Sequence, residues 1–152
     1  MKTLQTCFCS FAILAAVALS GCTAVTVKPV PASLQMKRVS FKENPAVIVP
    51  GFLDIVRDGF DRHGIATTVI SGDMPPGCEF QATYTALRSW DFTTYLALAE
   101  IRVEKDGRQV GFAKYHLRGK GGLSLMKWQG VKTKMDSVID ALLVEYPARA
   151  ER

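Results

Sequence analysis

The sequence predicts a two-layer α+β sandwich with the element order β-α-β-β-β-β-α, in which a mostly antiparallel sheet carries two helices on one face. Two observations lead to this fold class. In two segments the apolar residues recur at helical spacing and lie on a single face. Five other segments alternate apolar and polar residues or are rich in β-branched side chains, which is typical of strands. Helices with one apolar face each favour packing together on one side of a sheet.

The first strand is expected at residues 37–41, and the first helix follows it. We expect the helix to be capped at or near Asn44, with Pro50 tolerated in its first turn. It ends near His63, and Gly64 provides a left-handed stop. Its apolar positions share one helical face: Ile48, Phe52, Ile55, Val56 and Phe60.

A second strand at residues 66–70 completes a β-α-β unit, which is expected to be a right-handed crossover. Residues 79–90, 93–104 and 109–117 are the next three strands, and we expect them to pair antiparallel. The last two are joined by a hairpin turn, in which Asp106-Gly107 suits positive φ.

The last element is a helix from about Thr133 to Tyr146, which Pro147 ends. Thr133 and Asp136 have the spacing of a capping box. Residues 118–132, which precede this helix, are rich in glycine and basic side chains and are expected to form a loop.

The N-terminus is typical of a bacterial lipoprotein signal peptide. Lys2 precedes an apolar stretch at residues 8–19, which is shorter than the roughly 20 residues of a membrane-spanning helix. Leu19-Ser20-Gly21-Cys22 then matches the lipobox at all four positions. This pattern predicts removal of residues 1–21 and lipid attachment to Cys22. An uncleaved membrane anchor and an ordinary secretory signal are the alternatives.

Thr23, the residue after the lipobox cysteine, indicates which of the two bacterial membranes holds the protein. Aspartate at this position favours inner-membrane retention in enterobacteria, so Thr23 favours the outer membrane, facing the periplasm, with the inner membrane as the alternative. We expect residues 22–35 to be a lipidated N-terminus and a tether that Pro29 and Pro31 keep extended. Val25 and Val27 leave open a short edge strand. Residues 36–152 are then a single periplasmic domain.

Composition narrows the function classes. The net charge of +5 is compatible with anionic lipid or lipopolysaccharide phosphates, and equally with a plain soluble surface. Cys7 and Cys9 leave with the signal peptide and Cys22 carries lipid, so Cys78 stands alone. An internal disulfide and a metal site of several cysteines are thereby excluded. We expect no metal and no cofactor, and the compartment argues against nucleic acid.

One basic segment is the candidate contact surface, because residues 118–134 contain no acidic side chain. It consists of Arg118, Lys120, Lys127, Trp128 and Lys132. Such a surface suits lipid headgroups or an envelope protein partner. The alternative is that the apolar residues of the segment pack into the core while the lysines stay solvated.

The candidate catalytic residues are His63, His116 and Cys78. Neither a Gly-x-Ser-x-Gly elbow nor a His-Glu-x-x-His helix is present in the sequence. The leading hypothesis is therefore a non-enzymatic accessory or binding component of the cell envelope. A periplasmic hydrolase remains the alternative if these three residues converge. A module that binds lipopolysaccharide or peptidoglycan is a third.

Three runs of the sequence, at residues 59–65, 83–92 and 115–128, resemble a family of small proteobacterial lipoproteins whose members have no assigned activity. The resemblance covers essentially the whole chain after Cys22 and implies a cell-envelope location. It also implies that relatives carry a cysteine where Ser40 stands here, paired with the position of Cys78. In this chain Cys78 would then be a free thiol.

Overall fold

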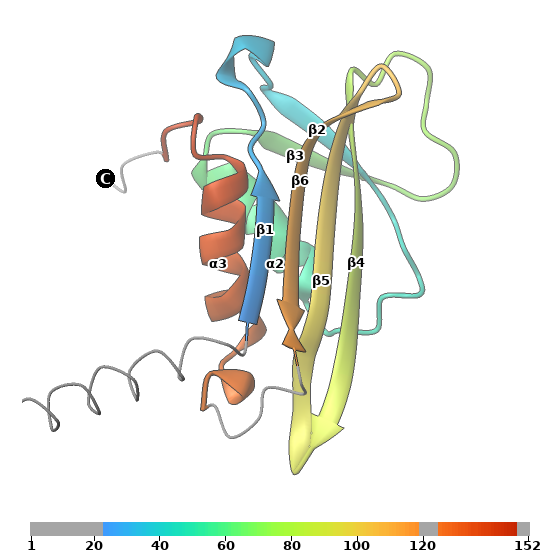
Figure 1. Ribbon diagram of the computed structural model, residues 1–152. Helices are drawn as coiled ribbons and strands as arrows, with labels where there is room; N and C mark the ends of the chain where they lie inside the picture. The colour runs from blue at the N-terminus through green and yellow to red at the C-terminus, as the bar shows by residue number, and fades with distance from the viewer. Residues whose placement is uncertain (1–22, 119–124, 149–152) are drawn as a thin grey trace, which may run out of the picture.

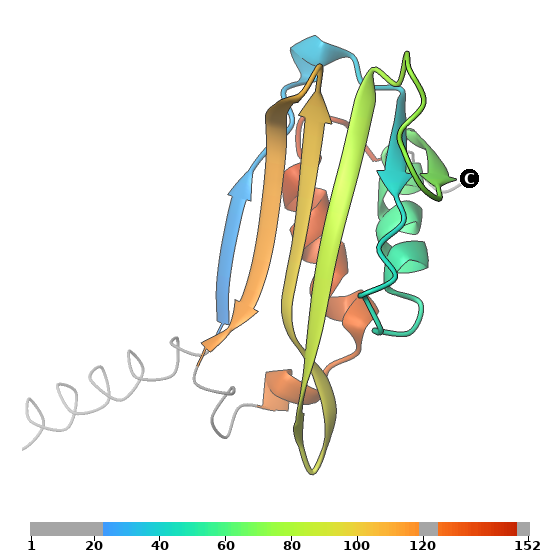
Figure 2. The same ribbon diagram turned by 90° about the vertical axis from the view of Figure 1, so that its right-hand side faces the viewer.

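The computed structural model describes residues 23–118 and 125–148 of the 152-residue chain. Its elements are β1 Thr23–Lys28, η1 Ala32–Leu34, β2 Arg38–Lys42, α2 Phe52–Arg62, β3 Ala66–Ile70, β4 Phe80–Asp91, β5 Thr93–Lys105, β6 Arg108–Leu117, η3 Leu125–Trp128 and α3 Val131–Leu142. Within these ranges the strands form one sheet in the order β1-β6-β5-β4-β2-β3. Both helices cover the same face of it (Figure 1, Figure 2). The predicted two-layer α+β fold is confirmed.

The pairing pattern follows the prediction with one addition. β2 and β3, which precede and follow α2 in the chain, pair with each other in parallel. β4, β5 and β6 form an antiparallel meander. β2 also pairs in parallel with β4, through Ser40 opposite Gln81. Asp106 and Gly107 have positive φ angles of 51° and 74° in the β5–β6 turn, as predicted.

The predicted tether is wrong at the N-terminal end of the described chain, where the edge-strand alternative is correct. Thr23 to Lys28 pair antiparallel with β6, in a register that places Thr23 opposite Leu117. The following prolines do not keep the chain away from the domain, because Val30 is fully buried and its N–H donates to the Leu142 carbonyl at 2.9 Å. Residues 22–35 were expected to be a spacer, but from Thr23 onward they belong to the fold.

The first helix starts later than predicted. It begins at Phe52, and Gly51 caps it in a left-handed conformation. Asn44 does not cap it; its side-chain amide donates to the Tyr84 carbonyl at 2.9 Å. Ile48 precedes the helix and is 69% exposed, so the apolar face of α2 starts at Phe52. The predicted stop is confirmed, since Gly64 has a φ of 73°.

The C-terminal helix differs from its prediction at both ends. It begins at Val131 and ends at Leu142, and its N-cap residue Gly130 makes no side-chain cap hydrogen bond. The expected capping box is therefore absent. Asp136 instead forms ion pairs with Arg62 of α2 and Lys132. Part of the expected loop before the helix is the short η3.

The core lies between the sheet and the helical layer. Phe41 of β2 packs edge-on against Phe60 of α2, with ring centres 5.3 Å apart. The two helices approach closely at Gly59, where an added Cβ would lie 2.7 Å from Cγ2 of Ile139 in α3. The helical layer therefore covers one face of the sheet.

Candidate functional site

The β4–β5 hairpin extends past the end of β6. Leu117, the last residue of β6, pairs with Thr23, whereas β4 and β5 continue to pair with each other as far as Asp91 and Thr93. We call residues 88–96 the overhang. In Figure 1 and Figure 2 it is the yellow hairpin that projects at the end of the sheet where β1 begins.

Lys127 ties η3 to the overhang. Its side chain is buried and forms an ion pair with Asp91. Its Nζ also lies 5.1 Å from the ring centre of Tyr95 and 5.3 Å from that of Trp128. The indole N–H of Trp128 donates to the Asp91 carbonyl at 3.4 Å. The Lys127 side chain is therefore part of an internal contact and does not face solvent.

Lys134 is a second buried lysine beside the first. Its Nζ donates to the main-chain carbonyl of Lys127 at 2.7 Å and lies 5.6 Å from the ring centre of Tyr115. Burial disfavours the charged ammonium and lowers the pKa of Lys134. Burial likewise raises the pKa of the Tyr115 hydroxyl. Both groups serve the packing of α3 on the sheet.

The predicted contact surface is therefore corrected. Lys127 does not belong to it, because it is buried, and Lys132 pairs with Asp136 at 2.8 Å within α3. Arg118, Trp128 and Lys132 are exposed and remain accessible, with Lys132 carrying its ion pair at the surface. Lys120 lies outside the described residues. Lys127 is buried because Asp91, a partly exposed carboxylate at the end of the distant strand β4, pairs with it.

The two most exposed aromatic side chains in the described part of the chain lie on the overhang, which the sequence analysis did not single out. Trp90 is 71% exposed and Phe92 is 89% exposed. Phe92 is the turn residue and has a positive φ of 56°, a conformation that favours glycine or asparagine. Neither the turn nor the core explains a phenylalanine there. The signal in the sequence was a pair of aromatic residues flanking Asp91, the acidic residue that ends β4.

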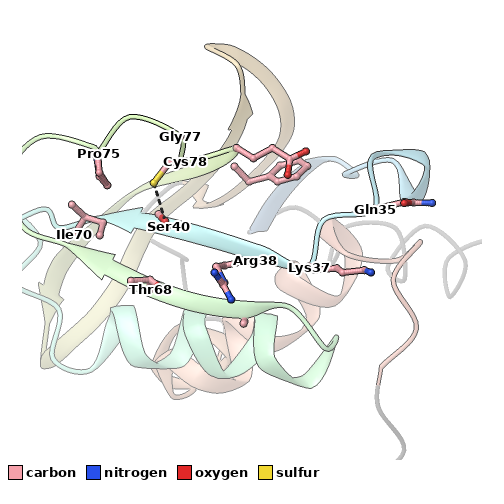
Figure 3. Close-up of a pocket in the computed structure, with 12 residues that line it drawn as sticks. Gln35, Lys37, Arg38, Ser40, Thr68, Ile70, Pro75, Gly77 and Cys78 are labelled. Atoms are coloured by element: carbon pink, nitrogen blue, oxygen red, sulfur yellow. Dashed lines mark hydrogen bonds between the residues drawn. The ribbon is translucent and has the colours of Figure 1, made fainter.

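A cavity of about 560 Å³ lies beside Cys78, between β2, β3 and the loop that leads into β4 (Figure 3). The Cys78 thiol donates to the Ser40 hydroxyl at 3.4 Å. Thr68 and Arg38 also line the cavity. The juxtaposition of Ser40 and Cys78 is the one that the family resemblance implied. Sequence reasoning did not find Arg38 or Thr68 as neighbours of Cys78.

His63 is held at the end of α2 by acceptors from the C-terminal part of the chain. Its side chain is 6% exposed, and its Nε2 lies 3.1 Å from Oδ1 of Asp140. Its Nδ1 faces the main-chain carbonyl of Tyr146. Burial raises the pKa of Asp140, but hydrogen bonds from Arg62 and His63 outweigh it, and the pKa is lowered overall. This cluster fastens the two helix ends together.

The structure does not gather the three candidate catalytic residues at one cavity. His116 is exposed on β6, opposite Ala24 and Leu98. Cys78 lines the cavity with Ser40, and neither His63 nor His116 is among the lining residues. Among residues 23–118 and 125–148, no group of three or more His, Cys, Asp or Glu side chains is placed to hold a metal ion.

The lipobox residues Leu19, Ser20, Gly21 and Cys22 lie outside the described part of the chain. In the part that is described, neither helix has the length and apolar character needed to cross a membrane.

Comparison with protein-family models and with curated proteins finds no match. Solved structures that are similar to this chain include two of the PelC dodecamer from Paraburkholderia phytofirmans. One, a point variant, has a TM-score of 0.55 and 12% identity over 84% of this chain and 98% of that chain. The other has a TM-score of 0.53 and 12% identity over 84% and 99%.

A minor lipoprotein from Acinetobacter baumannii matches with a TM-score of 0.29 and 10% identity, over 70% of this chain and 88% of that one. That score is too low to support an argument. At 12% identity the PelC structures show a shared fold.

Proposed function

We propose that this protein is a lipid-anchored lipoprotein of the bacterial cell envelope, held through Cys22 in the outer membrane and facing the periplasm. In this proposal it acts there as a non-enzymatic accessory or binding component. The observation that carries the proposal is the position of Thr23. The residue directly after the lipobox cysteine is already the first residue of β1, paired with Leu117. A chain processed at Cys22 therefore keeps Thr23–Lys28 of β1 and their pairing with β6.

The placement of reactive side chains favours the non-enzymatic role. A general base needs hydrogen-bond reach to its nucleophile, directly or through one water. Cys78 has Ser40 as its neighbour, while the ring nitrogens of His63 face Asp140 and Tyr146. An accessory protein needs accessible surface instead, and Arg118 and Trp128 retain it.

The anchoring part of the proposal is tested by growth with an alkyne analogue of palmitate. We expect the full-length chain to take up the label and to sediment with the outer membrane. Cys22→Ser should lose the label and accumulate with residues 1–21 attached. Incorporation that does not depend on Cys22, or none, would overturn lipidation. Label with inner-membrane density would correct only the membrane assignment.

The accessory role is tested by photo-crosslinking in cells from positions 118 and 132, which are exposed. We expect one dominant envelope protein to be captured at position 118. The matched control is position 54 on α2, which is exposed and lies outside the basic segment. Equal capture from all three positions, or none from position 118, would contradict a specific partner at this surface.

A further inference from the structure

We propose that the overhang of the β4–β5 hairpin docks on the phospholipid surface of the membrane that holds the lipid of Cys22. This inference rests on the proposed function, because it requires that lipid. It goes further by assigning one end of the sheet to the bilayer and by naming Trp90 and Phe92 as the contact residues.

First, the N-terminal end of β1 fixes where a lipid on Cys22 would lie relative to the sheet. Cys22 is joined by one peptide bond to Thr23, and consecutive Cα atoms are about 3.8 Å apart. Thr23 in turn is fixed by its pairing with Leu117 at the end of β6. Because no spacer separates β1 from the lipid attachment site, a lipid on Cys22 would hold this end of the sheet close to the membrane.

The second step is the reach of the overhang. Beyond Leu87 and Leu98, the pairs run from Arg88 opposite Leu96 to Asp91 opposite Thr93. At about 3.4 Å per residue, they project roughly 14 Å past the level of Thr23. β4 lies three strand spacings from β1, about 14 Å to the side. A membrane surface that touches both ends therefore crosses the strands obliquely, at roughly 45°.

The third step is the chemistry of the overhang. Tryptophan is enriched at membrane–water interfaces, where its apolar ring and polar N–H both find partners. Trp90 is 71% exposed and Phe92 is 89% exposed, on a turn that does not itself call for an aromatic residue. Together they offer apolar area and an indole N–H at the tip of a supported hairpin.

The fourth step is charge. Asp91 is the only acidic residue between Thr83 and Ala99, and its carboxylate is paired with Lys127. Arg88 is an exposed cation on the overhang itself. Anionic headgroups attract such side chains. A lipid anchor also raises the local concentration of the surface, so a weak docking contact suffices.

Brominated lipids test this directly, because the chain has two tryptophans. The full-length lipoprotein is purified from membranes and reconstituted in vesicles of phosphatidylethanolamine and phosphatidylglycerol, with or without bromine on the acyl chains near the headgroup. We expect bromine to quench the tryptophan emission of the wild type. Trp90→Phe should lose most of that quenching, and Trp128→Phe should keep it. The comparison of wild type with Trp90→Phe suffices if Trp128→Phe does not fold.

The matched variants are Phe92→Ser and Ile48→Ser. Phe92→Ser removes the neighbouring contact and should reduce the quenching of Trp90. Ile48 is 69% exposed but lies outside the overhang, so its substitution should leave quenching unchanged. Equal emission from Trp90 in brominated and ordinary lipid would overturn the inference.

A second copy of the chain is the competing occupant. Trp90 that is shielded from aqueous iodide but not quenched by bromine would show that protein covers the overhang, which also overturns the inference. Mass spectrometry of the N-terminal peptide distinguishes a failure of membrane docking from a failure of the proposed function. A lipidated Cys22 without quenching refutes membrane docking alone, whereas an unmodified Cys22 refutes the proposed function.

Discussion

Lys127 of η3 is buried against the β4–β5 hairpin and forms an ion pair with Asp91 at the tip of that hairpin. The contact joins two segments 36 residues apart in the sequence. Lys127 was expected on the contact surface, but its side chain supports the overhang instead. The ion pair therefore links the stability of this end of the sheet to the presentation of Trp90 and Phe92.

Lys127→Ala is expected to destabilise the protein. Removing one partner of a fully buried ion pair costs about 3–5 kcal/mol. The side chain of Asp91 is 40% exposed and can be hydrated, so we expect a smaller loss. A decrease of about 1–3 kcal/mol in the free energy of unfolding follows from leaving a partly buried charge unpaired. Urea denaturation of the purified protein in detergent measures it.

Lys132→Ala is the control for Lys127→Ala. Lys132 is exposed and pairs with Asp136 one helical turn away. Pairs of this kind contribute about 0.3–0.5 kcal/mol. Equal losses for the two variants would show that Lys127 is not a structural residue.

Ser40→Cys is expected to form a disulfide with Cys78. The Ser40 hydroxyl and the Cys78 thiol are 3.4 Å apart, and a bonded sulfur pair needs about 2.05 Å, so a small movement closes the bond. The new loop should raise the free energy of unfolding by about 2–4 kcal/mol. Thiol titration and non-reducing peptide mapping detect the bond.

Thr68→Cys is the comparison variant for this disulfide, since Thr68 lines the same cavity. Within the described part of the chain the Cys78 thiol donates to Ser40 and makes no hydrogen bond to Thr68, so we expect this variant to stay reduced. Two free thiols in Ser40→Cys under oxidising conditions would contradict the positions of Ser40 and Cys78.

Asp140→Asn should remove a pH-dependent contribution to stability. The Asp140 carboxylate accepts hydrogen bonds from Arg62 and His63, and its pKa in the folded protein is below the ordinary value of 3.8. A lowered carboxyl pKa stabilises the fold above the unfolded value, and this stability is lost as the pH falls through the folded value. Because Asp140 is 52% exposed, we expect less than about 1 kcal/mol at pH 7.

Denaturation of the wild type and Asp140→Asn across acidic pH measures this contribution. The difference between them should be largest above pH 4 and should shrink as the carboxylate is protonated. A difference that stays constant, or grows, in acid would contradict the role of the ionised carboxylate.

Gly59→Ala is expected to destabilise the protein although alanine is favoured over glycine in helices by about 1 kcal/mol. Its Cβ would lie 2.7 and 2.9 Å from side-chain atoms of Ile139, and such overpacking costs about 1–3 kcal/mol. Gly130→Ala is the control, because its nearest contact would be 3.9 Å away, at Thr133. Thermal unfolding that ranks Gly59→Ala above the wild type would contradict the close approach of α2 and α3.

Local patterns predicted much of the fold. The β5–β6 turn followed from Asp106-Gly107, and the end of α2 followed from Gly64, because both depend on the backbone preference of nearby residues. β1 was harder to predict because its partner β6 lies more than 80 residues further along the chain. Two prolines after β1 also favoured an extended spacer, while packing of Val30 against α3 decided otherwise.

The site depended on contacts that local patterns do not contain. Lys127 was expected on the surface because its neighbours are glycine-rich and basic, and only the sheet reveals Asp91 as its partner. The exposure of Trp90 follows from the length by which β4 and β5 outrun β6, which is a property of strand register. The Ser40–Cys78 contact came from the family resemblance rather than from spacing.

The most direct test of the central claim is the mass of the N-terminal peptide of the protein isolated from bacterial membranes. We predict a chain that begins at Cys22 and carries acyl groups on that residue, directly before the Thr23 of β1. A chain that retains residues 1–21, or one that begins elsewhere with an unmodified Cys22, would contradict lipid anchoring. It would also remove the reason for placing this end of the sheet against the membrane.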